Sequence, residues 1–194
     1  MPLNLTEMIN LFSEDPKDYH APPRRYSTLY LLRRDISSCL GTKLVTKEPD
    51  RPPSAQWPGA MAVLAGIDLL AKFYSGDDRG SVGTRFKDFL QSKYFNLNHN
   101  ESYIIYHLRN SLLHSFGLYS FDRKLNKEYW FTLVAKYDPL IELLKTDHYK
   151  IDVMALYKSF ESSVELYLID LKTDPDLQNK FFILFHKYGS VYIY

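Results

Sequence analysis

A run of six residues in the middle of the chain carries side chains of the types that acid–base chemistry needs. Arg109-Asn110-Ser111-Leu112-Leu113-His114 lies late in an apolar-periodic segment, and Phe116-Gly117 follows it. The run supplies a fixed cation, a hydrogen-bonding amide and an imidazole that can transfer a proton near neutral pH. We therefore expect a reactive site made of Arg109, Asn110 and His114.

The specificity of this motif rests on its amide residue. With nine Arg and six His in 194 residues, an Arg followed by a His five to seven residues later is expected about 0.8 times by chance. Requiring Asn directly after the Arg, at the spacing seen here, lowers that expectation to about 0.01. Asn110 and its place near a helix end therefore carry more weight than Arg109 and His114 alone.

A helix from Glu101 to about Ser115, with Asn100 as its candidate N-cap, is expected to carry the motif. At about 100° per residue, its core stripe consists of Ile105, Leu108, Leu112 and Phe116. The opposite face carries Tyr103, His107, Asn110 and His114. Arg109 lies about 140° from His114 around an ideal helix. Unless the last turn unwinds at Gly117 or the long Arg109 side chain bends across the groove, we expect a second subunit to complete the site.

The elements that position this helix are expected to form one mainly α-helical domain over 1–194. An N-terminal arm, 1–22, contains a short helix over 3–13 and ends in breaks at Asp15-Pro16 and Pro22-Pro23. Apolar periodicity predicts further helices over about 24–39, 60–74, 86–95, 101–115, 153–171 and 175–186. The segment 60–74 is apolar on most sides and is expected at the centre of the bundle.

Strand-like periodicity after Gly117 predicts a small β-hairpin insertion over 118–136. Its two strands are separated by the polar residues 122–127. The segment 140–144 fits either a helical turn or another strand, and the extended stretch 149–151 fits a strand that joins the hairpin. The predicted fold class is an up-and-down helical bundle with this small insertion.

The segment Tyr103–Tyr119 resembles the signature helix of the HEPN superfamily, whose motif is Arg, four to six residues, then His, commonly with a polar residue after the Arg. The apolar helix 60–74, the connection Gly76-Asp77-Asp78-Arg79-Gly80 and the helix 86–95 also look like a stand-alone bacterial branch of that superfamily. The resemblance implies a helical up-and-down bundle that is usually dimeric. Two motif helices then face each other across the two-fold axis, and catalytic members cleave RNA without a metal.

Under this resemblance, His114 is the acid or base, Arg109 stabilises the phosphorane and Asn110 orients the substrate. Cleavage by the 2′-hydroxyl needs both a base and an acid, and a homodimer supplies two motif histidines. Products would end in a 2′,3′-cyclic phosphate. A toxin or phage-defence role with an antitoxin partner is also implied. Phe116 stands where some HEPN toxins carry a Tyr that the antitoxin modifies, so that route of control is not expected.

Other residues are candidate contacts to RNA or phosphate. They are Arg79, Arg85, Tyr103, Tyr106, His107 and Tyr119. Core or dimer packing explains the aromatic residues equally well. The motif also has a structural interpretation, in which Arg109 pairs with a carboxylate, Asn110 caps a backbone group and His114 closes the helix end. A non-catalytic HEPN-like dimeric scaffold and a nucleotide-sensing module therefore remain alternatives.

Composition narrows the class of protein. The 24 basic and 23 acidic residues give a net charge of +1, so nucleic-acid binding must come from local clusters of charge. The single Cys39 excludes an intrachain disulfide and indicates a reducing compartment. We expect a cytoplasmic protein without a membrane segment, because the N-terminus is not a secretory signal and no apolar run is long enough to span a bilayer. The six His show no zinc-site spacing, so neither a metal nor another cofactor is expected.

Overall fold

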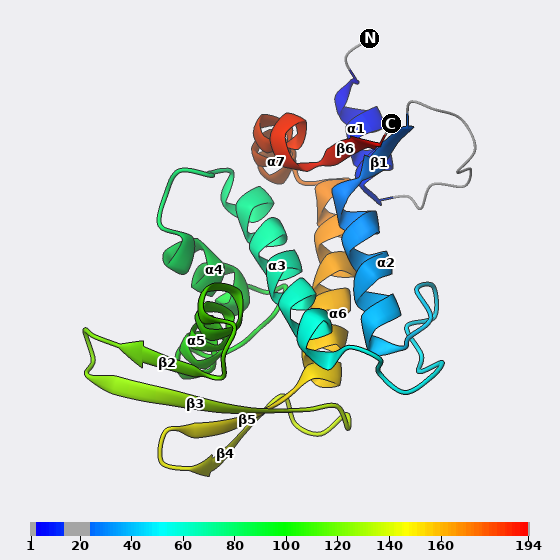
Figure 1. Ribbon diagram of the computed structural model, residues 1–194. Coiled ribbons are helices and arrows are strands. Elements are labelled where there is room, and N and C mark those ends of the chain that lie inside the picture. The colour runs from blue at the N-terminus through cyan, green and yellow to red at the C-terminus, as the bar shows by residue number, and fades with distance from the viewer. Residues whose placement is uncertain (1–2, 14–23, 194) are drawn as a thin grey trace.

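The computed structural model of the chain describes residues 3–13 and 24–193. Helices form most of this structure, and short strands form two small sheets (Figure 1). The helices are α1 (Leu5–Ser13), α2 (Thr28–Leu40), α3 (Gln56–Ser75), α4 (Val82–Gln91), α5 (His99–Ser115), α6 (Val153–Leu171) and α7 (Pro175–Tyr188). The strands are β1 (Arg24–Ser27), β2 (Tyr119–Asp122), β3 (Lys127–Val134), β4 (Ile141–Lys145), β5 (His148–Asp152) and β6 (Ser190–Ile193). The predominance of helix is confirmed, but the fold is mixed rather than a pure helical bundle.

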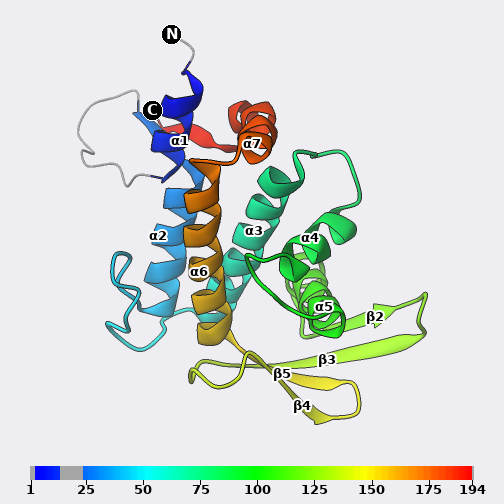
Figure 2. The same cartoon turned by 180° about the vertical axis from the view of Figure 1, so that it is seen from behind.

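Helix α3 lies at the centre of the fold, as its apolar sequence predicts. Figures 1 and 2 show α2 and α6 on one side of it and α4 with α5 on the other. Its side chains Val63, Ile67 and Leu70 are fully buried. Gly66 lets α6 approach closely, since a Cβ at that position would lie 2.6 Å from the Phe160 ring. Helix α3 is therefore the buried centre between these two groups of helices.

The predicted helix over 24–39 begins later than expected. Residues Arg24–Ser27 form β1, which pairs antiparallel with β6 near the other end of the chain. Helix α2 then starts at Thr28, because the Ser27 hydroxyl accepts a hydrogen bond from the Tyr30 N–H at 3.1 Å and caps it. A partner 165 residues away thus overrides local helical periodicity. Gly41 ends α2 in the left-handed conformation, with φ 68°.

The predicted hairpin over 118–136 is present as β2 and β3, but it belongs to a larger sheet. The strand order is β2-β3-β5-β4. Strand β5 runs parallel to β3, and β4 pairs antiparallel with β5 at the outer edge. The stretch 149–151 joins the hairpin as expected, and of the two alternatives for 140–144 the structure shows the strand, so the insertion is larger than the two-stranded hairpin over 118–136. The sheet spans Tyr119 to Asp152 and leads directly into α6.

This four-stranded sheet packs against α5 (Figure 1). Strand β3 alternates, so Tyr129 and Phe131 are buried while Trp130 is 47% exposed. The inward ring of Tyr129 stacks on His107 of α5, with ring centroids 4.0 Å apart. The sheet thereby covers the middle of the motif helix and leaves its C-terminal end uncovered.

The ends of α4 and α5 differ from the predicted boundaries. Helix α4 covers Val82–Gln91 rather than 86–95, and Tyr94 and Phe95 are buried from the turn that follows it. Their apolar side chains continue the spacing of α4, so the sequence pattern looks like that of a longer helix. Helix α5 is capped by Asn98, not Asn100, since Asn98 and Glu101 form a reciprocal capping box. The order Asn-x-x-Glu in the sequence is the signal that identifies this cap.

The N-terminal helix predicted over 3–13 is confirmed as α1. The breaks predicted at Asp15-Pro16 and Pro22-Pro23 lie outside the described residues. In the two described ranges, none of the helices combines the length and apolar character of a membrane span.

Candidate functional site

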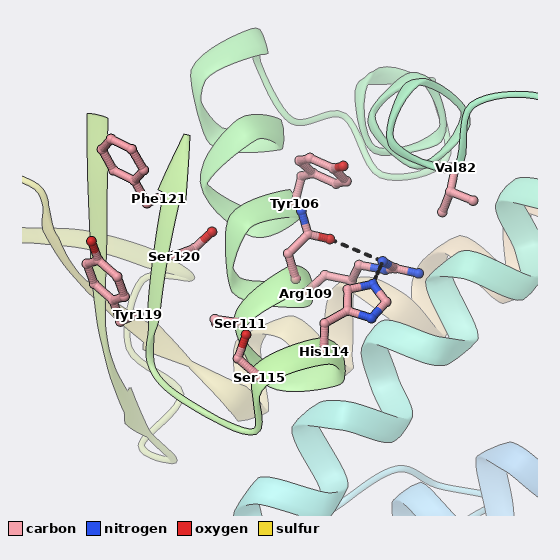
Figure 3. A pocket seen from close by; sticks show the side chains of 10 residues that line it. Val82, Tyr106, Arg109, Ser111, His114, Ser115, Tyr119, Ser120 and Phe121 are labelled. Carbon is pink, nitrogen blue, oxygen red and sulfur yellow. Dashed lines mark hydrogen bonds between the residues drawn. The ribbon is translucent and has the colours of Figure 1, made fainter. Parts of the chain in front are cut away.

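The three motif side chains meet within one chain. Arg109 Nη1 lies 2.7 Å from His114 Nε2 and donates to Asn110 Oδ1 at 3.1 Å. Figure 3 shows Arg109 and His114 side by side at the end of α5. The long Arg side chain bends around the last turn of the helix and covers the angle between the two positions. Of the alternatives that the sequence leaves open, the bent Arg109 side chain therefore brings the two groups together within one chain.

The Arg109–His114 contact fixes the role of each ring nitrogen. A guanidinium group has only N–H donors, so His114 Nε2 is the acceptor and is unprotonated in this arrangement. The neutral ring then carries its proton on Nδ1. Protonation of Nε2 would set two donors against each other, so it requires the ring to move away from Arg109. His114 is exposed, which leaves room for that movement.

Asp68 of α3 is a site residue that sequence reasoning missed. Its Oδ2 accepts from Arg109 Nε at 3.0 Å and from Nη2 at 2.5 Å. Both side chains are mostly buried, with 12% and 13% exposed for Arg109 and Asp68. Asp68 is the single acidic residue in the apolar helix α3, and that exception is the signal that sequence reasoning had available. One part of the structural interpretation is therefore met, because Arg109 does pair with a carboxylate.

The motif faces a pocket of about 600 Å³. We call it the motif pocket, and α5, β2 and the first residue of α4 form its walls. The side chains that matter for the site are Tyr106, Arg109, Asn110, His114, Tyr119 and Phe121. Figure 3 shows Tyr119 and Phe121 on β2, across from the helix that carries the motif. Two of the candidate aromatic contacts, Tyr106 and Tyr119, are thus placed beside the motif.

The other two candidates on α5, Tyr103 and His107, line a neighbouring hollow of about 380 Å³, which we call the side pocket. His107 is 5% exposed, so its expected place on the solvent face of α5 is wrong. Its Nδ1 lies 3.0 Å from Ser120 Oγ and its Nε2 lies 3.3 Å from Asp122 Oδ2. Burial lowers the pKa of His107, and Asp122 opposes that shift.

Arg79 and Arg85 lie apart from the motif. Arg85 is 6% exposed and donates from Nη1 to the Asp77 carbonyl at 3.0 Å. Its side chain lines a third hollow at the start of α4 together with Asp77 and Asp88. Arg79 is exposed, and its backbone N–H donates to the Asp77 carboxylate at 2.8 Å. The structure therefore does not bring either guanidinium to His114.

Phe116 ends the motif helix in an unusual way. It adopts φ 48°, and the Gly117 N–H donates to the Ser111 carbonyl at 3.0 Å, which closes the helix C-terminus. The expected place of Phe116 in the core stripe is wrong, since Phe116 is 67% exposed. Its ring lies beside that of Trp57, with the ring centroids 5.8 Å apart. The left-handed residue turns the chain away from α5 just after His114, which keeps the histidine at an open end.

No group of three or more His, Cys, Asp or Glu residues in the described ranges is arranged to hold a metal ion. Comparison of the chain with protein-family models, with curated proteins and with solved structures gives no match.

Proposed function

We propose that this protein is a metal-independent endoribonuclease of HEPN type. The observation that carries the proposal is the meeting of Arg109, Asn110 and His114 on the wall of one open pocket. A cation, an amide and an exposed imidazole in contact supply charge stabilisation, orientation and proton transfer. Under this proposal, the long helices α2, α3, α5 and α6 correspond to the up-and-down bundle of that superfamily, with α3 lying between α5 and the pair α2 and α6.

The proposed reaction starts when a substrate phosphate replaces His114 as the partner of Arg109 Nη1. The freed Nε2 takes the proton of the 2′-hydroxyl, and the 2′-oxygen bonds to the adjacent phosphorus. The bond from phosphorus to the 5′-oxygen then breaks, and that oxygen takes a proton from an acid. Arg109, held by Asp68, stabilises the charge on the phosphorane. The product ends in a 2′,3′-cyclic phosphate.

The acid in this scheme is the reason to propose a homodimer. His114 is the histidine that lines the motif pocket, and it is already assigned as the base. A two-fold axis near α5 would bring a second His114 to the opposite side of the phosphate. Light scattering at micromolar concentration should then give twice the 22.8 kDa chain mass. If the protein is a monomer and still cleaves RNA, the proposal of a site shared between two subunits is rejected. The proposal also includes a toxin or phage-defence role, with an antitoxin protein as partner.

The decisive test is incubation of purified protein with total RNA and transfer RNA in EDTA. Wild-type protein should cleave, and mass spectrometry of the products should find 2′,3′-cyclic phosphate ends. His114→Ala should leave the RNA intact. His186→Ala is the matched control, because His186 is also an exposed histidine but lies on α7. Intact RNA with the wild-type protein under several salt and pH conditions would reject the ribonuclease.

A second candidate function is a non-catalytic interaction module. The ion pair between Arg109 and Asp68 favours it, because the contact ties α5 to α3 and would be retained without any substrate. The two candidates differ in what Arg109→Lys does. Lys keeps the charge but loses the two-pronged contact with Asp68, so a ribonuclease should lose activity. An interaction module should keep its partner binding.

A further inference from the structure

The side pocket adjoins the motif pocket. Both hollows are lined by Tyr106, Asn110 and Phe121, so a chain that leaves the motif along these residues enters the side pocket directly. Gly83, in the first turn of α4, also lines the side pocket. A Cβ at Gly83 would lie 2.6 Å from the Tyr106 hydroxyl oxygen, so this position keeps Tyr106 close to α4. Asn110 thus lies between the reacting groups and a second binding volume.

Three cations line the side pocket without carboxylate partners. They are Lys87, Arg123 and Lys124. Across residues 3–13 and 24–193, none of the three forms an ion pair. Asp122 is the acidic residue that lines the same hollow, and its Oδ1 already accepts the N–H groups of Lys124 at 2.8 Å and Leu125 at 3.2 Å. A local excess of positive charge therefore exists in a chain whose net charge is only +1.

Aromatic faces lie beside these cations. Lys87 Nζ lies 3.7 Å from the centroid of the Tyr103 ring and 5.3 Å from that of Tyr106. Phe121 is 44% exposed where the two pockets meet. Cations interleaved with accessible aromatic rings are typical of proteins that bind single-stranded nucleic acid, where phosphates meet the charges and unpaired bases stack on the rings. A duplex keeps its bases stacked inside and offers the rings no partner.

We propose that the side pocket binds the nucleotide next to the scissile phosphate in a single-stranded RNA. Lys87, Arg123 and Lys124 contact the phosphates of that segment. Tyr103 and Phe121 contact its base. This inference rests on the proposed ribonuclease function and specifies its substrate class, namely unpaired RNA of at least two nucleotides.

Binding should be measured on full-length protein that carries His114→Ala, so that the RNA stays intact. A labelled twelve-nucleotide single strand and the matching duplex are compared by fluorescence anisotropy. The single strand should bind at least tenfold more tightly than the duplex. Changing Lys87, Arg123 and Lys124 to Gln should weaken single-strand binding at least tenfold. The slope of log affinity against log salt concentration should become shallower by about 2, at about 0.7 per lost phosphate contact.

A control triple variant matches this change in charge and residue type. Arg34, Lys43 and Lys172 are exposed and are changed to Gln together, which lowers the net charge by the same three units. Single-strand affinity should then change less than twofold. Equal weakening by both triple variants would overturn the side pocket as the binding site. Tyr103→Leu should weaken the single strand about tenfold without changing duplex binding.

The same variants separate this inference from the ribonuclease proposal. In a protein that retains His114, the side-pocket triple should raise KM for single-stranded RNA at least tenfold. Cleavage with an unchanged KM would reject the side pocket as the binding site and would leave the ribonuclease proposal in place. A different result would reject the ribonuclease and keep the side pocket as an RNA-binding site. In that case the wild-type protein leaves RNA intact, and the variant with Lys87, Arg123 and Lys124 changed to Gln no longer binds the single strand.

Discussion

Two histidines on one helix have nearly the same angular position but lie in different environments. His107 and His114 lie seven residues apart on α5, so they share almost the same angular position. His107 is buried beneath the sheet, stacked on Tyr129 and bonded to Ser120. His114 is exposed at the helix end, with its Nε2 on Arg109. The sheet covers one region of the helix and not the other.

Because their environments differ, we expect the two imidazole rings to have different roles. A buried imidazole that stacks on Tyr129 and contacts Ser120 through Nδ1 holds α5 against the sheet. An exposed imidazole in contact with a cation has room to turn, which is what the proposed ribonuclease requires of it. Helical periodicity alone placed both on a solvent face. Their separation is therefore a property of tertiary structure, and each histidine should fail in its own way when it is removed.

The largest expected effect is on catalysis by His114. His114→Ala should lower the rate of RNA cleavage by about 10²–10⁴-fold, the usual range for loss of a general acid or base. The free energy of unfolding should change by less than about 0.5 kcal/mol, since the side chain is exposed. Cleavage assays and urea unfolding measure the two quantities. A large loss of stability with unchanged cleavage would reverse the roles assigned to the two histidines.

Removal of Asp68 tests what holds Arg109 at the open end. Asp68→Ala should lower the free energy of unfolding by about 2–4 kcal/mol, because the mostly buried guanidinium loses the carboxylate to which it donates twice. Cleavage should fall as well, because Arg109 is no longer oriented. Chemical denaturation measures the first effect. Asp35→Ala serves as the control, since its ion pair with Arg34 is exposed and should contribute less than about 1 kcal/mol.

His107→Ala tests the covered region. It should lower the free energy of unfolding by about 2 kcal/mol, because it removes the stack on Tyr129 and leaves Ser120 without its partner. The cleavage rate of the folded protein should change much less than in His114→Ala. Urea unfolding and cleavage well below the unfolding midpoint provide the comparison. Loss of cleavage equal to that of His114→Ala would place His107 in the reaction instead.

The burial of His107 also predicts how stability depends on pH. Burial lowers its pKa below 6.5 in the folded protein, Asp122 opposes this, and Lys87 with Lys127 reinforces it. The unfolded chain therefore binds a proton more readily than the folded one. The contribution of His107 to the free energy of unfolding should be fully present above about pH 6.5. It should be lost as the pH falls toward the lowered pKa of the folded protein. Unfolding of wild type and His107→Ala from pH 7.5 to 5 should show a steeper decline in the wild type.

The sequence predicted the local features of the site better than its surroundings. Helix α5, the buried α3 and the hairpin all follow from local periodicity. The Asp68–Arg109 pair joins residues 41 positions apart on two helices, and no local pattern encodes it. The parallel pairing of β3 with β5 and the pairing of β1 with β6 are likewise long-range. The 140° separation describes Cα positions, and the long Arg109 side chain spans that angle, which was one of the alternatives that the sequence leaves open.

The smallest expected effect concerns the residue that keeps the end of α5 open. Phe116 holds a left-handed conformation that glycine adopts without strain, and its ring contacts Trp57. Phe116→Ala removes the ring but keeps the backbone strain, whereas Phe116→Gly removes both. The Gly variant should therefore be about 1 kcal/mol more stable than the Ala variant, as urea unfolding would measure. Equal stability would mean that the turn after His114 is not strained. If cleavage is retained in both variants, the exposure of His114 depends on where the helix ends and not on the Phe116 ring.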